Sequence, residues 1–234
     1  MTSTTTPSGV RASTQTSDFP ELGKRLEQAF FLAAERFKYW RVELSGLTPI
    51  IVDIPKEHRL RKGFTFATTS GMSVLVSTRV LELGWTASIC ATVLVHELLH
   101  HWQKHEDRGR ALGIDQSFGS QSAVDWNTAC DFEINDDLED AGCEFPLDPD
   151  DPSGKKRWGL FPDEYGFPRH LTAEEYFALI IAARSKGGKQ GAAVDKAQPM
   201  NPHGCGSGAG APNPLEQELG LGEKKRRGKG RDGE

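Results

Sequence analysis

The sequence predicts an α+β fold in which a small antiparallel sheet packs on a central helix and other helices flank both. Three features indicate this fold: a cluster of short β-prone runs, one long helical segment that is apolar on nearly every side, and further helical patterns with clear caps. The chain has 234 residues, and both of its ends are poor in large apolar side chains. We therefore expect one domain between two unstructured ends.

The N-terminal stretch is the first of these ends. Residues 1–17 are rich in Ser and Thr and offer too little apolar area to offset the entropy lost on ordering, so we expect a disordered arm. Pro20 then suits the first turn of a helix. Apolar side chains recur with helical spacing as far as Trp40 and predict one amphipathic helix over the core, with apolar positions at Leu22, Leu26, Phe30, Ala33 and Phe37.

Three short β-prone runs come next, at Pro49–Ile54, Phe64–Thr68 and Ser73–Thr78. The last two are separated only by the tight connection at residues 69–71, which favours a hairpin. The three runs therefore predict the small antiparallel sheet.

The central helix is expected from Thr86, which is placed as its N-cap, to about Lys104. Its sequence is apolar on nearly every side as far as His96. Such a pattern is typical of a helix that passes through the interior of a domain.

Two further helices are expected after a polar loop. The first covers Val124 to about Asp140, and the last covers Thr172–Arg184, with Thr172 as N-cap and Glu175 in the capping-box position. Beyond them the composition changes to Gly, Pro, Ala and charged residues. We therefore expect a folded domain over residues 18–184 and a flexible tail over residues 185–234.

Charge and composition limit the partners. The formal net charge of -5 indicates neither nucleic acid nor a membrane as an obligatory partner. The basic run at residues 223–231 is most simply a solvated terminus. The Ser- and Thr-rich start contains no apolar run that could form a signal peptide or a membrane span, so we expect a cytoplasmic protein.

The central helix carries the motif HExxH as His96, Glu97 and His100. Residues four apart lie on one face of a helix, so the two histidines can direct one imidazole nitrogen each at a single ion. Three ionisable groups in a buried helix would be costly unless a metal engaged them. The motif predicts a Zn²⁺ site in which Glu97 takes a proton from a zinc-bound water that attacks a carbonyl.

Two histidines leave the ion short of the three protein ligands that are usual in catalytic zinc sites. On the helix that follows, a polar row of Asn127, Asp131 and Asn135 adjoins an apolar row. We expect Asp131 to be the third ligand, with Asn127 and Asn135 orienting it. His105 is the alternative ligand, but on an unbroken helix it turns away from His100, and no glycine between them forces a break.

The segments HELLHHWQKH and WNTACDFEIND resemble a bacterial and phage-encoded putative metallopeptidase domain family, which often occurs beside a von Willebrand factor A-like domain. The resemblance runs from about Ser73 to Asp140, with a weaker echo at residues 203–208. The residues after Arg184 are too few and too polar for a von Willebrand A-like domain, so any such partner, or an ATPase, is expected to be a separate protein.

The resemblance implies a zincin-like metallopeptidase. Zinc would be bound by His96, His100 and an acidic residue that matches Asp131, with Glu97 as the base. In zincins the strand before the active-site helix borders the extended substrate, and Ser73–Thr78 has that place in the chain order. We expect it to pair with a protein or peptide substrate through backbone hydrogen bonds.

The function that the sequence favours is therefore an intracellular zinc-dependent metallopeptidase. Two alternatives stay open. One is a non-catalytic, zinc-stabilised binding or adaptor module, against which Glu97 argues because a structural site gains little from a general base. The other is a zinc hydrolase that acts on a non-peptide amide.

Overall fold

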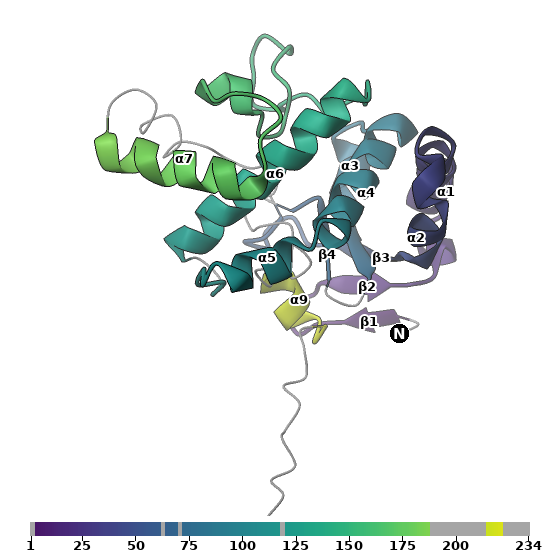
Figure 1. Ribbon diagram of the computed structural model, residues 1–234. Coiled ribbons are helices and arrows are strands. Elements are labelled where there is room, and N and C mark those ends of the chain that lie inside the picture. Colours follow the sequence, from purple (N-terminus) through teal and green to yellow (C-terminus); the bar gives the residue numbers. More distant parts are fainter. Residues whose placement is uncertain (1–2, 62–63, 70–71, 118–119, 188–213, 222–234) are drawn as a thin grey trace, which may run out of the picture.

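A computed structural model of the chain describes most of its length, namely residues 3–61, 64–69, 72–117, 120–187 and 214–221. These residues form an α+β fold, as predicted, in which helices cover a mixed sheet (Figure 1). The helices are α1 (Pro20–Arg36), α2 (Arg41–Gly46), α3 (Arg79–Glu82), α4 (Ala87–Trp102), α5 (His105–Ala111), α6 (Gln121–Asp140), α7 (Ala173–Lys186) and α9 (Pro214–Glu218), with 3-10 turns at Thr16–Asp18, Lys38–Trp40 and Pro162–Tyr165.

The sheet of the described residues has the strand order β1-β2-β3-β5-β4. Its strands are β1 (Ser3–Thr5), β2 (Arg11–Ser13), β3 (Thr48–Asp53), β4 (Phe66–Thr68) and β5 (Ser73–Ser77). β4 and β5 form the expected hairpin, but β3 and β5 run parallel, so the prediction of a purely antiparallel sheet is wrong. The connection from β3 to β4 is long enough to skip one strand position, which β5 fills, and β4 becomes the outer strand.

The N-terminal segment also differs from the prediction. The residues expected to form a disordered arm contribute β1 and β2, which extend the sheet beyond β3. Gly9, with φ +86°, makes the turn between them, and Ala12 pairs with Val52 of β3. Val10 is fully buried. Low apolar content predicted disorder wrongly for this segment, because pairing with an existing strand supplies backbone hydrogen bonds to a short polar segment.

The two faces of the sheet belong to different parts of the core, because side chains alternate along each strand. One face packs against α1 and α4, and the opposite face is covered by α9 together with the connection from β3 to β4. The first face is formed by Ile51, Phe66, Val74 and Val76, and the second by Ile50, Val52, Ala67 and Leu75.

α4 is the central helix, and α1 lies along it above the sheet (Figure 1). The side chain of Thr86 accepts a hydrogen bond from the backbone N–H of Ile89, which confirms the predicted N-cap. The helix ends at Trp102, before the predicted end, because Lys104 adopts a left-handed conformation with φ 56°. α5 starts at the next residue in a new direction.

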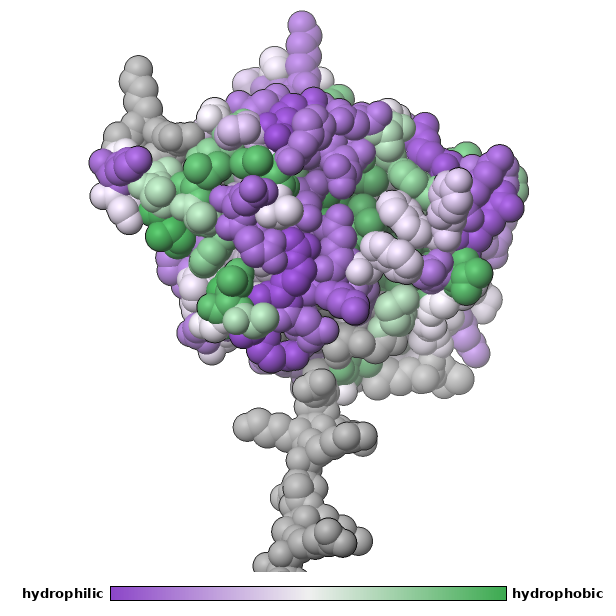
Figure 2. All heavy atoms as spheres, in the orientation of Figure 1, coloured by the Kyte–Doolittle hydropathy of each residue, from purple (hydrophilic) through white to green (hydrophobic). Residues whose placement is uncertain are grey.

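α6 and α7 pack on each other beside α4 and enclose a separate hydrophobic cluster around Trp126, Phe132 and Tyr176. The Thr172 and Glu175 capping box at the start of α7 is present as predicted. Figure 2 shows hydrophobic residues gathered over this pair of helices, whereas hydrophilic residues cover the middle of the same face. α6 touches α4, so the two parts of the molecule meet along these helices.

Part of the predicted tail is ordered. Leu215 and Leu219 of α9 are buried against the sheet face that bears Val52, so the boundary predicted at residue 184 excludes a segment that belongs to the core. The weaker family resemblance at residues 203–208 and the basic run at residues 223–231 lie outside the described residues. Among the residues that are described, no helix is long and apolar enough to cross a membrane.

Candidate metal centre

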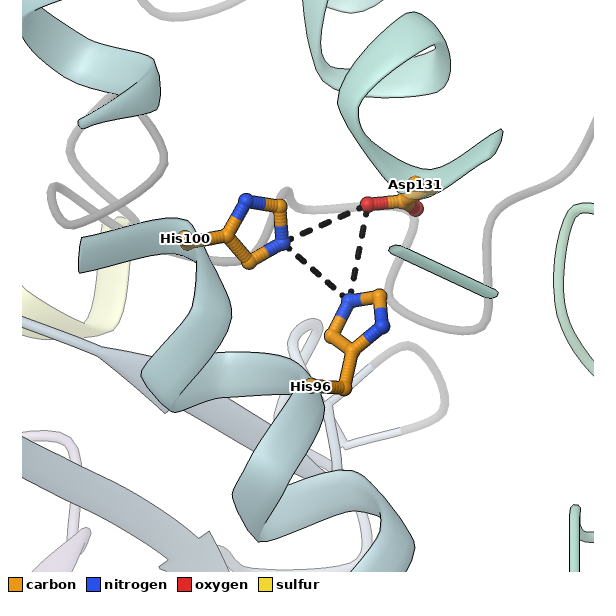
Figure 3. Close-up of side chains that lie close together, drawn as sticks. All are labelled: His96, His100 and Asp131. Carbon is orange, nitrogen blue, oxygen red and sulfur yellow. Dashed lines mark hydrogen bonds and ion pairs between the residues drawn. The ribbon is translucent and has the colours of Figure 1, made fainter. Parts of the chain in front are cut away.

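The two motif histidines and Asp131 come together where α4 meets α6. His96 and His100 lie one turn apart on α4, and Asp131 faces them from the middle of α6 (Figure 3). All three side chains are buried, with exposed fractions of 3%, 0% and 4% in that order. The third residue that the sequence predicted from the polar row of α6 therefore lies beside the motif.

One atom from each of the three residues points to a common centre. The two Nε2 atoms of His96 and His100 are 3.1 Å apart, and Asp131 Oδ1 is 3.5 Å from the first and 3.4 Å from the second. A tetrahedral zinc site with bonds of about 2.0–2.2 Å places its donor atoms about 3.3–3.6 Å apart. Among the described residues, these three form a group that could hold a metal ion.

Asn135 determines which nitrogen of His96 faces the centre. The amide nitrogen of Asn135 donates to the backbone carbonyl of Leu160 at 2.9 Å, so its Oδ1 is the atom that meets His96 Nδ1, also at 2.9 Å. Nδ1 must then be the donor, and the lone pair of a neutral His96 ring lies on Nε2. The sequence predicted that Asn135 would orient Asp131, but the structure places it on His96 instead.

His105 lies behind His100 rather than beside it. Its Nδ1 is 2.9 Å from His100 Nδ1, the ring nitrogen that points away from Asp131. The break at Lys104 makes this contact, because it turns the chain back toward α4 without a glycine. Among the described residues His105 does not join the three donor atoms, and the structure places the alternative ligand of the sequence analysis in contact with a predicted ligand.

Asp131 is held as a carboxylate. Burial alone would raise its pKa, but the neighbouring imidazoles of His100 and His96 outweigh burial and hold the pKa of Asp131 well below its usual range. Asn127 donates to its second oxygen, Oδ2, at 3.5 Å, and its role in orienting the carboxylate stays a prediction. Burial also lowers the pKa of His100 to about 3, so this ring is neutral and can offer a lone pair.

Glu97 lies beside the three donors without joining them. Its side chain is 2% exposed, and Oε2 accepts hydrogen bonds from the backbone N–H of Thr68 at 3.0 Å and from its hydroxyl at 3.1 Å. Burial raises the pKa of Glu97 to about 7 despite these bonds and the nearby His96. A carboxyl group with such a pKa can accept and release a proton near neutral pH.

Sequence reasoning missed three contributors: Thr68 of β4, the carbonyl of Leu160, and Glu133, whose carboxylate lies 3.2 Å from His105 Nε2. Thr68 and Leu160 act through groups whose direction depends on distant parts of the chain, so no local pattern marks them. Glu133 had a visible signal, because an acidic residue in a largely buried helix needs a partner.

A family model with the description "Putative metallopeptidase domain" matches residues 57–229. The matched region contains α4 and α6, which carry every residue of the donor triangle, and it continues through α9 into the predicted tail. No curated protein and no solved structure matches the chain.

Proposed function

This chain belongs to the putative metallopeptidase domain family, and on that premise we propose that it is a zinc-dependent peptidase of the zincin type. The family supports a metal-dependent hydrolase in general terms. The identity of the metal, the residues that bind it and the reaction are our proposal. His96, His100 and Asp131 would hold the zinc, and Glu97 would be the general base.

The observation that carries the proposal is the arrangement of lone pairs. Nδ1 of His96 is committed to Asn135, so two imidazole nitrogens and a carboxylate oxygen face one another within 3.5 Å in a buried site. These three atoms can stay this close only with a proton or a cation among them, and a cation is the occupant that all three can bond at once. Two nitrogens and one oxygen are also the ligand set of many catalytic zinc sites, which leave a fourth position open.

When bound, zinc would polarise a carbonyl oxygen and lower the pKa of water from 15.7 to about 7. The residues of the chain then supply the proton transfers. Thr68 donates to Oε2 of Glu97 and so holds the carboxylate in place. The base can remove a proton from the attacking water and later deliver it to the leaving amine, because its pKa lies near neutral pH.

The prediction that Ser73–Thr78 pairs with the substrate is wrong. Ser73–Ser77 is β5, which pairs with β3 on one side and β4 on the other, so it cannot add a substrate strand. β4 is the last strand in the sheet order of the described residues, and the N–H of Thr68 points from it toward Glu97. We infer that an extended peptide substrate passes next to Glu97 and Thr68, as in a zincin-like arrangement.

The test compares the wild type with Glu97→Gln, which keeps the shape of the side chain but cannot accept a proton. Each purified protein is assayed for bound zinc and for cleavage of a mixed protein substrate, and the exposed Glu27→Gln on α1 serves as the control. We expect all three proteins to bind one zinc ion. Cleavage by Glu97→Gln should fall roughly 10²–10⁴-fold.

Loss of cleavage together with loss of zinc would leave the role of Glu97 as base unsupported. If the wild type binds zinc but cleaves no protein, the result would favour one of the two alternative functions, an adaptor module or a hydrolase of non-peptide amides. The cytoplasmic location and a separate ATPase or von Willebrand A-like partner stay predictions.

A further inference from the structure

A chain of hydrogen bonds leads away from the donor triangle through His100. Nδ1 of His100 meets Nδ1 of His105 at 2.9 Å, and Nε2 of His105 meets Oε2 of Glu133 at 3.2 Å. The chain thus links α4 to the start of α5 and then to α6. None of these contacts is needed to bring His100 near His96, since both lie on one face of α4.

The direction of each proton in this chain follows from Glu133. Its Oε2 also accepts the backbone N–H of Ala173 at 3.0 Å and lies 3.2 Å from a guanidinium nitrogen of Arg108, so it acts as an acceptor. His105 must therefore donate from Nε2. The same ring then has its lone pair on Nδ1, and His100 must donate to it from its own Nδ1. The lone pair of His100 is left on Nε2, which is the atom that faces Asp131.

His105 is held firmly enough to set this direction. Its side chain is fully buried, and its backbone carbonyl accepts a hydrogen bond from the indole N–H of Trp126 at 3.0 Å. The indole also packs edge-on against the imidazole of His105. Arg108 joins Glu133 to Glu174 of α7, so three helices hold the outer end of the chain.

We propose that His105, backed by Glu133, is a positioning residue that holds the proton of His100 on Nδ1 and thereby presents Nε2 to the metal. This inference rests on the proposed metal site but adds a residue that does not bind the ion. Partners of this kind orient metal-binding histidines, and their removal typically weakens metal binding roughly 10- to 100-fold.

Two substitutions separate the hydrogen bond from simple packing. In His105→Asn the amide oxygen can take the place of Nδ1 and accept from His100. In His105→Gln the amide nitrogen can take the place of Nε2 and donate to Glu133, but no acceptor remains beside His100. His170→Gln is the control, because that imidazole is 60% exposed and belongs to another part of the chain.

The zinc dissociation constant of each purified metal-free protein is measured by competition with a chelator. We expect His105→Gln to bind zinc roughly 10- to 100-fold more weakly than the wild type, and His105→Asn and the control to stay within about 3-fold of it. Equal affinities for the Asn and Gln variants, whether both unchanged or both reduced, would overturn the proposal.

A second measurement needs no substitution. Long-range ¹H–¹⁵N NMR spectra of the wild type distinguish the two neutral forms of a histidine ring. We expect His105 to carry its proton on Nε2 and His100 on Nδ1, and a proton on Nδ1 of His105 would overturn the proposal. If the wild type binds no zinc, the proposed function fails, whereas the proton position on His105 still decides this inference.

Discussion

Asn135 decides which nitrogen of His96 carries the proton, because its own amide nitrogen is committed to the carbonyl of Leu160. His105 has the same effect on His100. At the scale of single residues, the candidate site is therefore defined as much by the neighbours that orient the donor atoms as by the donors themselves.

Thr68 allows a test of the base at this scale. Glu97 works as a base only when it is ionised, so activity is lost as the pH falls through its pKa, which burial raises to about 7. A bound cation favours the carboxylate and moves this acidic limb to lower pH. The hydroxyl of Thr68 also favours the carboxylate. Thr68→Val should therefore shift the acidic limb of kcat/KM upward by roughly one pH unit.

Thr65→Val is the matched control for this shift. Thr65 is buried near the same strand, and its hydroxyl has no partner among the described residues. Its removal should leave the pH profile unchanged. An unchanged limb in Thr68→Val, or an equal shift in both variants, would contradict the assigned role of Glu97.

The sequence predicted the inner part of the site from local spacing. His96, Glu97 and His100 follow from the helical repeat, and Asp131 follows from a polar row beside an apolar one. The contact of Asn127 with Asp131 followed from the same row. The partners of His96 and His100 could not be predicted in this way, because they depend on how the chain after Trp102 and the loop around Leu160 return to α4.

At the scale of elements, the close approach of α5 to α6 holds His105 in place. A β-carbon on Gly109 would lie 2.7 Å from Nε1 of Trp126 and 2.8 Å from Nε2 of Gln116. The indole N–H of Trp126 is the group that binds the backbone of His105. Only glycine therefore allows the two helices to come this close.

Gly109→Ala should lower the free energy of unfolding by about 1–3 kcal/mol, because overpacking forces buried groups to move. Urea unfolding measures the change, and zinc affinity should fall in the same variant. Gly46→Ala is the control: nothing lies within 4 Å of its added methyl group, so stability should stay equal or rise slightly. Equal stability of Gly109→Ala and the wild type would contradict the described packing of α5.

The elements themselves were predicted best where local chemistry specifies them. The N-cap of α4 and the capping box of α7 lie where the sequence placed them. The end of α4 was predicted two residues too late, because Lys104 adopts its left-handed conformation without being a glycine. Strand pairing was missed for another reason: a run of apolar residues predicts a strand but not which strand lies beside it.

At the scale of the whole molecule, the candidate site joins two parts of the core. α4 belongs to the cluster that includes α1 and one face of the sheet, whereas most of the buried apolar residues of α6 pack with α7. α9 lies on the other face of the sheet, away from α4 (Figure 1). Its contribution should therefore be to stability and not to metal binding.

Leu215→Ala tests this separation. The side chain is fully buried, and its truncation should cost about 2–5 kcal/mol of unfolding free energy while zinc affinity stays unchanged. Gln217→Ala on the exposed side of α9 should change neither quantity. A fall in zinc affinity that matches the loss of stability would show that the sheet and the metal centre are not independent in this way.

The central claim is that His96, His100 and Asp131 bind one zinc ion together. Anomalous X-ray diffraction at the zinc absorption edge, from crystals grown with one equivalent of zinc, tests it most directly. We predict a single strong peak about 2.0–2.2 Å from the Nε2 atoms of both histidines and from a carboxylate oxygen of Asp131. A zinc peak elsewhere in the chain, or one bonded to His96 and His100 without Asp131, would contradict the claim.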